Sequence, residues 1–154
     1  MASGGDTINR PIELGHPADV SFGVKDLNAR QHRVLDLLPG FGSQVIVRKR
    51  DVSMLDLAAL TAKTGDEFAM FTHKGERLII RGDSRHIRIN EDDIILLRAE
   101  GYRWSGHTHP GITSVDLEAS QGDKDALSAF GQSNSVIYNA AGKHRLIYPK
   151  EGTM

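Results

Sequence analysis

The segment His107-Thr108-His109-Pro110-Gly111 constrains the fold of this chain more than any other stretch. It follows the strand-forming residues 102–105, and its Pro-Gly pair ends any strand that reaches it. Because alternate residues of an extended strand lie on one face, the two imidazoles can point into one volume. Such a pair is a common beginning of a metal site, and a strand end that opens into a loop leaves a metal accessible to substrate.

Length and composition exclude several other classes of protein with a His-x-His segment. The chain has 154 residues, enough for one domain but too few for a barrel of eight strand–helix units, which needs about 200 or more. It contains no cysteine, so any transition metal must be held by histidine and carboxylate side chains. With 19 basic and 20 acidic residues the net charge is -1, which predicts no general attraction to nucleic acid.

The sequence predicts a soluble chain without a membrane anchor. No apolar run reaches the roughly 18 residues that a membrane-spanning helix needs. Residues 1–6 lack the basic and apolar regions of a signal peptide. We therefore expect either a cytoplasmic protein or a domain that is delivered as part of a larger secreted chain.

The hydrophobic pattern predicts an α+β fold in a single domain, with a mixed sheet flanked by helices. Residues 1–25 show no periodicity, so an irregular leader is expected before a domain of residues 26–154. Helices are predicted at 27–38, 53–65, 90–101 and about 120–130. Strands are predicted at 44–48, 67–73, 77–81, 102–109, 135–139 and 145–148.

Three acidic residues are candidates to complete a metal site around the two histidines. A hydrolytic zinc site needs three protein ligands, an open position for water and a nearby base. Asp123 is the preferred third ligand because it begins the helix after the loop, and Asp116 inside that loop is the alternative. Glu67 begins a strand and is the candidate general base, since a carboxylate can take a proton from water.

In chain order, these residues resemble the JAMM (MPN-plus) metalloprotease family. The matching residues are Glu67 at a strand start, His107-Thr108-His109-Pro110, and Ser120-Gln121-Gly122-Asp123 at a helix start. The resemblance covers the chain from about residue 53 onward. The segment 104–111 is also similar to the JAMM-like domains at the ends of bacterial polymorphic toxins.

The resemblance implies a fold, a cofactor and a role for each residue. It implies an MPN-type sheet and a zinc ion held by His107, His109 and Asp123. Glu67 would be the base that activates water, and Ser120 would stabilise the oxyanion of the intermediate. The implied activity is cleavage of a peptide or isopeptide bond by a deubiquitinase-like domain or a bacterial toxin or effector. The implied partners are a protein or peptide substrate, including ubiquitin-like proteins, and a cognate inhibitory protein.

The loop after Pro110 departs from the family pattern. Up to Ser120 it is a few residues longer than the usual spacing, whereas an alignment on Thr113-Ser114-Val115-Asp116 makes it shorter than usual. Both aspartates are followed by helix-compatible residues, so the third ligand stays open between Asp123 and Asp116.

Three residues of the predicted site also have a purely structural explanation. Ser120 and Asp123 form the pattern of a helix capping box, and Glu67 fits a charged strand end. Two other functions therefore remain open: a non-enzymatic MPN-like module that binds a partner, and a different zinc hydrolase. Zinc deaminases are excluded because their signature contains two cysteines. Because these residues occur together in family order, we favour the catalytic interpretation.

Overall fold

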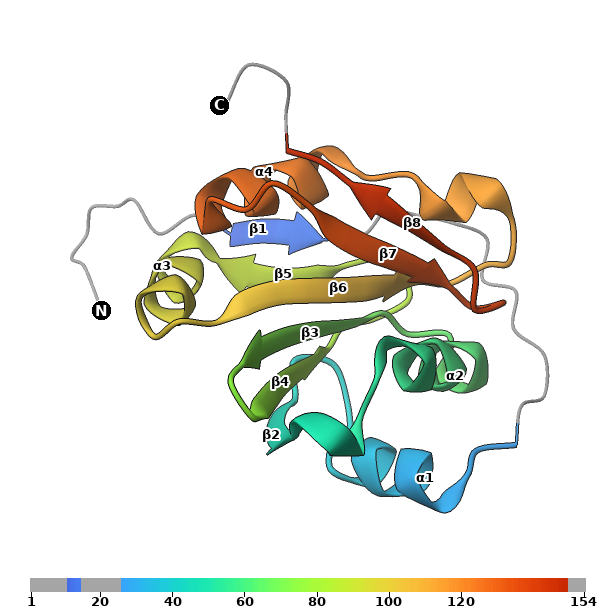
Figure 1. The fold of residues 1–154 in the computed structure, drawn as a ribbon. Coiled ribbons are helices and arrows are strands. Elements are labelled where there is room, and N and C mark those ends of the chain that lie inside the picture. Colours follow the sequence, from blue (N-terminus) through green and yellow to red (C-terminus); the bar gives the residue numbers. More distant parts are fainter. Residues whose placement is uncertain (1–10, 15–25, 150–154) are drawn as a thin grey trace.

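A six-stranded mixed sheet forms the centre of the fold, with helices on both of its faces (Figure 1). The computed structural model describes residues 11–14 and 26–149. Its helices are α1 (Ala29–Asp36), α2 (Met54–Thr64), α3 (Glu91–Ala99) and α4 (Gln121–Phe130), with short 3-10 helices η1 (Lys49–Asp51) and η2 (Ser114–Leu117). Its strands are β1 (Pro11–Leu14), β2 (Gln44–Arg48), β3 (Phe68–His73), β4 (Glu76–Arg81), β5 (Ile87–Asn90), β6 (Arg103–His109), β7 (Ser135–Asn139) and β8 (His144–Ile147). Within the described ranges, no helix is long and apolar enough to cross a membrane.

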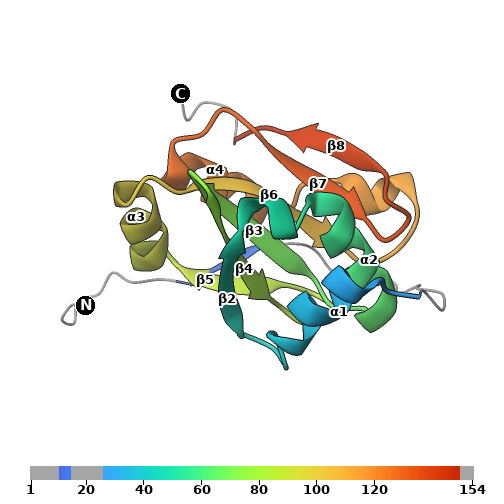
Figure 2. The ribbon, with the colours of Figure 1, turned by 60° about the horizontal axis from the view of Figure 1, so that its bottom comes forward.

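The order of strands places the end of β6 beside the start of α4. The large sheet runs β2-β4-β3-β6-β7-β8, and β1 pairs with β5 in a separate two-stranded sheet (Figure 2). Every pair in the large sheet is antiparallel except β6 with β7, which are parallel. Parallel neighbours need a crossover, and η2 and α4 supply it here. The crossover therefore begins where the His-x-His segment ends.

A β-bulge in β6 decides which side chains share a face of the sheet. In β3, Ala69 pairs with His107 and Phe71 pairs with Trp104. Because residues 69 and 71 lie on one face of β3, Trp104 and His107 also share a face, although they are three residues apart. The register shift between the two pairs leaves Ser105 as an extra residue of β6.

Each face of the sheet has its own apolar core. On the face of Trp104, buried side chains come from β1, β5, α3 and α4, and they include Ile12, Ile87, Ile94, Leu127 and Phe130. The opposite face packs against α1 and α2, through residues that include Val34, Leu57, Leu60, Phe68 and Met70. The sheet is thus enclosed by two separate layers, which agree with the helices that flank it in Figure 1.

The structure confirms most of the predicted elements and corrects the interpretation of the leader. Residues 11–14 form strand β1, which pairs with β5 from Pro11–Asn90 to Leu14–Ile87, so this part is not irregular. The remainder of the predicted leader, residues 1–10 and 15–25, lies outside the described residues. Neither β1 nor β5 was predicted, because such a short segment shows no clear alternation and becomes buried only when it pairs.

Asp56 links the first two helices. It lies in the first turn of α2, where its carboxylate accepts hydrogen bonds from the Ser53 backbone N–H at 2.8 Å, Gln31 Nε2 at 2.9 Å and Arg30 Nη2 at 2.6 Å. Burial alone would raise the pKa of Asp56, but the hydrogen bonds from Arg30, Gln31 and Ser53 outweigh it and lower that pKa. The charged form of Asp56 therefore holds α1 against α2.

Asp56→Asn should reduce the free energy of unfolding by about 1–2 kcal/mol at neutral pH, since hydrogen bonds to a charged group are lost. A carboxylate whose pKa is lowered by folding stabilises the fold above its unfolded pKa of about 3.9, and this contribution disappears as the pH falls through the folded value. Urea unfolding at several pH values measures the difference between wild type and variant, which should shrink below about pH 4. The exposed Glu118→Gln is the control, and a pH-independent difference for Asp56→Asn would contradict the prediction.

Candidate metal centre

Three side chains from β6 and α4 converge in the interior. The Nε2 atoms of His107 and His109 are 3.0 Å apart. Asp123 places Oδ1 at 3.0 Å from Nε2 of His107 and Oδ2 at 3.5 Å from Nε2 of His109. All three residues are 0% exposed, and their ligand atoms lie within 4.8 Å of one another. The structure thus brings together the preferred set of the sequence analysis.

The local structure of α4 explains why Asp123 reaches the histidines. Ser120 is the N-cap of α4: its Oγ accepts from the Asp123 backbone N–H at 3.0 Å, and Asp123 Oδ2 accepts from the Ser120 N–H at 3.0 Å. A Cβ at Gly122 would overlap the carbonyl oxygen of Glu13, so the first turn of α4 lies directly on β1. The capping box and this close contact together orient the carboxylate toward β6.

Asp116 supports the site through its backbone and not through its carboxylate. Its carboxylate Oδ2 accepts hydrogen bonds from Thr113, from the backbone N–H at 3.0 Å and from Oγ1 at 2.7 Å. Its backbone carbonyl lies 2.9 Å from Nδ1 of His109. When Nδ1–H donates to that carbonyl, Nε2 keeps its lone pair for a metal. The alternative third ligand is therefore a residue that orients His109.

The other neighbours of the histidines hold β6 in place. The ring of Trp104 lies against His107, with 4.9 Å between the ring centroids. Thr108, between the histidines, points to the opposite face, where its Oγ1 accepts from the Phe68 backbone N–H at 2.9 Å and is paired with Thr61 Oγ1 at 2.5 Å. The role of Thr108 was not predicted, because it depends on contacts between distant segments.

Glu67 lies at the border of the cluster. It directly precedes β3, whose residue Ala69 pairs with His107 of β6. Its side chain is buried, and its backbone is held by the N–H of Gly82 and the carbonyl of Asp83 at 2.7 and 2.8 Å. Glu67 is thus held beside the strand that carries the histidines.

The electrostatics and spacing of the cluster fit a metal ion. Burial alone would raise the pKa of Asp123, but attraction and hydrogen bonding to His107 and His109 hold that pKa well below its ordinary value. A tetrahedral ion at about 2.0–2.1 Å from its ligands would separate them by about 3.3 Å, close to the observed spacing. Two imidazole nitrogens and one carboxylate oxygen can therefore hold a metal ion here.

Asp123→Asn should lower the affinity for Zn²⁺ by at least about 100-fold. Loss of a residue that only orients a ligand lowers metal affinity by about 10–100-fold, and loss of a ligand should lower it at least as much. Asp116→Asn keeps the backbone carbonyl that contacts His109, so its affinity should stay within a few-fold of wild type. Calorimetric titration with Zn²⁺ measures both, with thermal unfolding as the test that each variant is folded. Equal losses in the two variants would contradict the assignment of Asp123.

Comparison with known proteins found no family model, no curated protein and no solved structure that matches this chain.

Proposed function

We propose that this chain is a zinc-dependent hydrolase of the JAMM type that cleaves peptide or isopeptide bonds. The observation that carries the proposal is the buried group of His107, His109 and Asp123. Catalytic zinc sites use three such protein ligands and keep a further position open. When bound, zinc would supply Lewis-acid polarisation of the scissile carbonyl and a lowered pKa for water.

Glu67 is the proposed general base. A carboxylate beside the attacking water takes its proton, and the resulting carboxylic acid then donates a proton to the departing amine. Its backbone hydrogen bonds to Gly82 and Asp83 support this role, because a base must be held in a fixed position to act. Its position two residues before Ala69, which pairs with His107, supports the same role.

Ser120 is the proposed oxyanion donor. Its Oγ accepts a hydrogen bond from the Asp123 N–H at 3.0 Å, and that bond does not use the hydroxyl proton. The proton is therefore available to an oxygen that becomes negatively charged in the transition state. Ser120 is half-buried, whereas the proposed metal ligands and Glu67 are fully buried, so it is the member of the site nearest to solvent.

The family resemblance extends the proposal to substrate, partners and setting. We propose a protein or peptide substrate, including ubiquitin-like proteins, for a domain that acts as a bacterial toxin or effector within a larger protein. A cognate inhibitory protein would then accompany it. A non-enzymatic binding module needs neither a base nor an oxyanion donor, so the positions of Glu67 and Ser120 favour the enzyme.

Glu67→Gln should retain zinc but reduce kcat by about 10²–10⁴-fold, the usual contribution of a general acid–base group. Fluorogenic peptide libraries and an isopeptide-linked ubiquitin dimer are the substrates, and metal content is measured on the same samples. Activity retained with bound zinc would remove Glu67 as the base. No hydrolysis by the zinc-loaded wild type of any substrate in this panel would contradict the proposed function.

Ser120→Ala should reduce kcat by about 10²–10³-fold if its hydroxyl stabilises the oxyanion. The substitution also removes a helix cap, which costs about 1 kcal/mol of stability. Ser53→Ala removes the equivalent cap of α2, away from the site, and is the matched control. Equal changes of kcat in the two variants would show that Ser120 acts only as a cap.

A further inference from the structure

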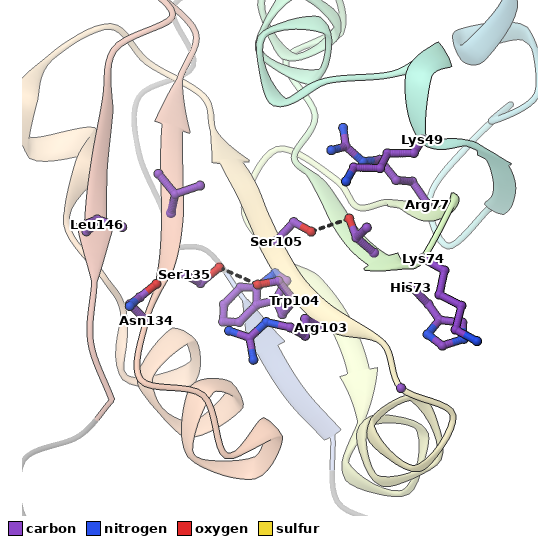
Figure 3. A pocket seen from close by; sticks show the side chains of 13 residues that line it. Lys49, His73, Lys74, Arg77, Arg103, Trp104, Ser105, Asn134, Ser135 and Leu146 are labelled. Atoms are coloured by element: carbon purple, nitrogen blue, oxygen red, sulfur yellow. Dashed lines mark hydrogen bonds between the residues drawn. The ribbon is translucent and has the colours of Figure 1, made fainter.

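A basic hollow of about 730 Å³ is lined by residues of β3, β4, β6, β7 and β8 (Figure 3). Thr72 on its floor alternates with Phe71, which shares the face of Trp104 and His107. The hollow is lined by polar and apolar residues that include Lys49, Thr72, Arg77, Arg103, Ser105, Val136 and Leu146. We name it the basic hollow.

Two arginines of the basic hollow stand on one row across three strands. Thr72 of β3 pairs directly with Arg77 of β4 on one side and with Arg103 of β6 on the other. Neighbouring strands are about 4.8 Å apart, so the two arginine backbones are separated by about 10 Å. Between them, Thr72 Oγ1 and Ser105 Oγ form a hydrogen bond of 2.6 Å, drawn as a dashed line in Figure 3. Lys49 lies beside Arg77 in the same view.

Three positive charges of this face have no acidic partner among the described residues. In residues 11–14 and 26–149, none of Lys49, Arg77 and Arg103 forms an ion pair. The nearby Glu76 precedes Arg77 in β4, so its side chain lies on the other face of the sheet. On that face, burial raises the pKa of Tyr102, and the negative charge of Glu76 adds a smaller increase.

Arg77 is held in place by a hydrogen bond from one end of its guanidinium group. Its Nη1 donates to the carbonyl oxygen of Val52, whereas its buried Nε has no hydrogen-bond partner within the described ranges. Burial lowers the pKa of Arg77. A bound anion would offset the repulsion between the positive charges of this row.

We propose that the basic hollow binds a small phosphate-bearing molecule. Arginine matches the geometry of phosphate oxygens, and the Thr72 and Ser105 hydroxyls add donors at the floor. Lys49 and Arg77 lie on the side of β3 and β4, whereas the Arg103 side chain extends from β6 toward β7 (Figure 3). Val136 of β7 and Leu146 of β8 also line the hollow and would contact the organic part of the ligand. The volume is within the range of about 300–1,000 Å³ of small-molecule sites. An extended acidic peptide would instead need cations spaced along a longer groove.

Calorimetric titration with sodium pyrophosphate and with ADP tests this proposal. We expect both to bind, and ADP to bind more tightly because its organic part contacts the apolar side. Arg103→Gln, at an exposed residue, should weaken both by about tenfold, the effect of one charge-assisted contact. The matched control is Arg145→Gln, which removes the same charge from the opposite face of β8 and should leave the affinity unchanged.

Three results would overturn the proposal: no binding of either probe, equal weakening in Arg103→Gln and Arg145→Gln, or tighter binding of a hexaglutamate peptide than of ADP. Tighter binding of pyrophosphate than of ADP would show that the organic part of the ligand makes no favourable contact. The ligand would then be an inorganic phosphate and not an organic one. Asp123→Asn must still bind both probes, because the basic hollow lies on the other face. Loss of binding in that variant would place the anion at the metal centre and overturn the site.

Discussion

The buried contact between Asp123 and the two histidines of β6 is the interaction on which the site and its surroundings depend. A carboxylate removed from water is costly unless it is paired, and Asp123 is paired with the Nε2 atoms of His107 and His109. The pairing fixes the start of α4 against the end of β6. Because α4 is the crossover to β7, the same contact also sets the parallel pair at the centre of the sheet.

Structural and chemical roles coincide at the start of α4. Ser120 and Asp123 satisfy each other's backbone N–H groups, as any capping box does, yet the same arrangement directs one carboxylate at the histidines and keeps one hydroxyl proton available. Gly122 lets β1 approach this turn closely. The short N-terminal strand is therefore part of what positions the proposed zinc ligand.

The bulge at Ser105 separates the two functional faces that we infer. It lets Trp104 pack against His107 on one face, while Arg103 stays on the face of Thr72 and Arg77. Without the extra residue, alternation along β6 would place Arg103 with the histidines. One irregular position thus assigns the proposed metal to one side of the sheet and the basic hollow to the other.

The local features of this protein could be predicted from its amino-acid sequence. Periodicity and caps located the four helices and six of the eight described strands, and the spacing of His107 and His109 identified the pair that shares a face. The choice of Asp123 over Asp116 as the residue grouped with the two histidines required the three-dimensional structure. Both belong to the same Ser/Thr-x-x-Asp pattern and both form capping boxes, so nothing local distinguishes them. The two carboxylates differ in their positions within the crossover between β6 and β7. These positions depend on contacts between segments far apart in the chain, including the pairing of β6 with β7 and the contact of β1 with α4.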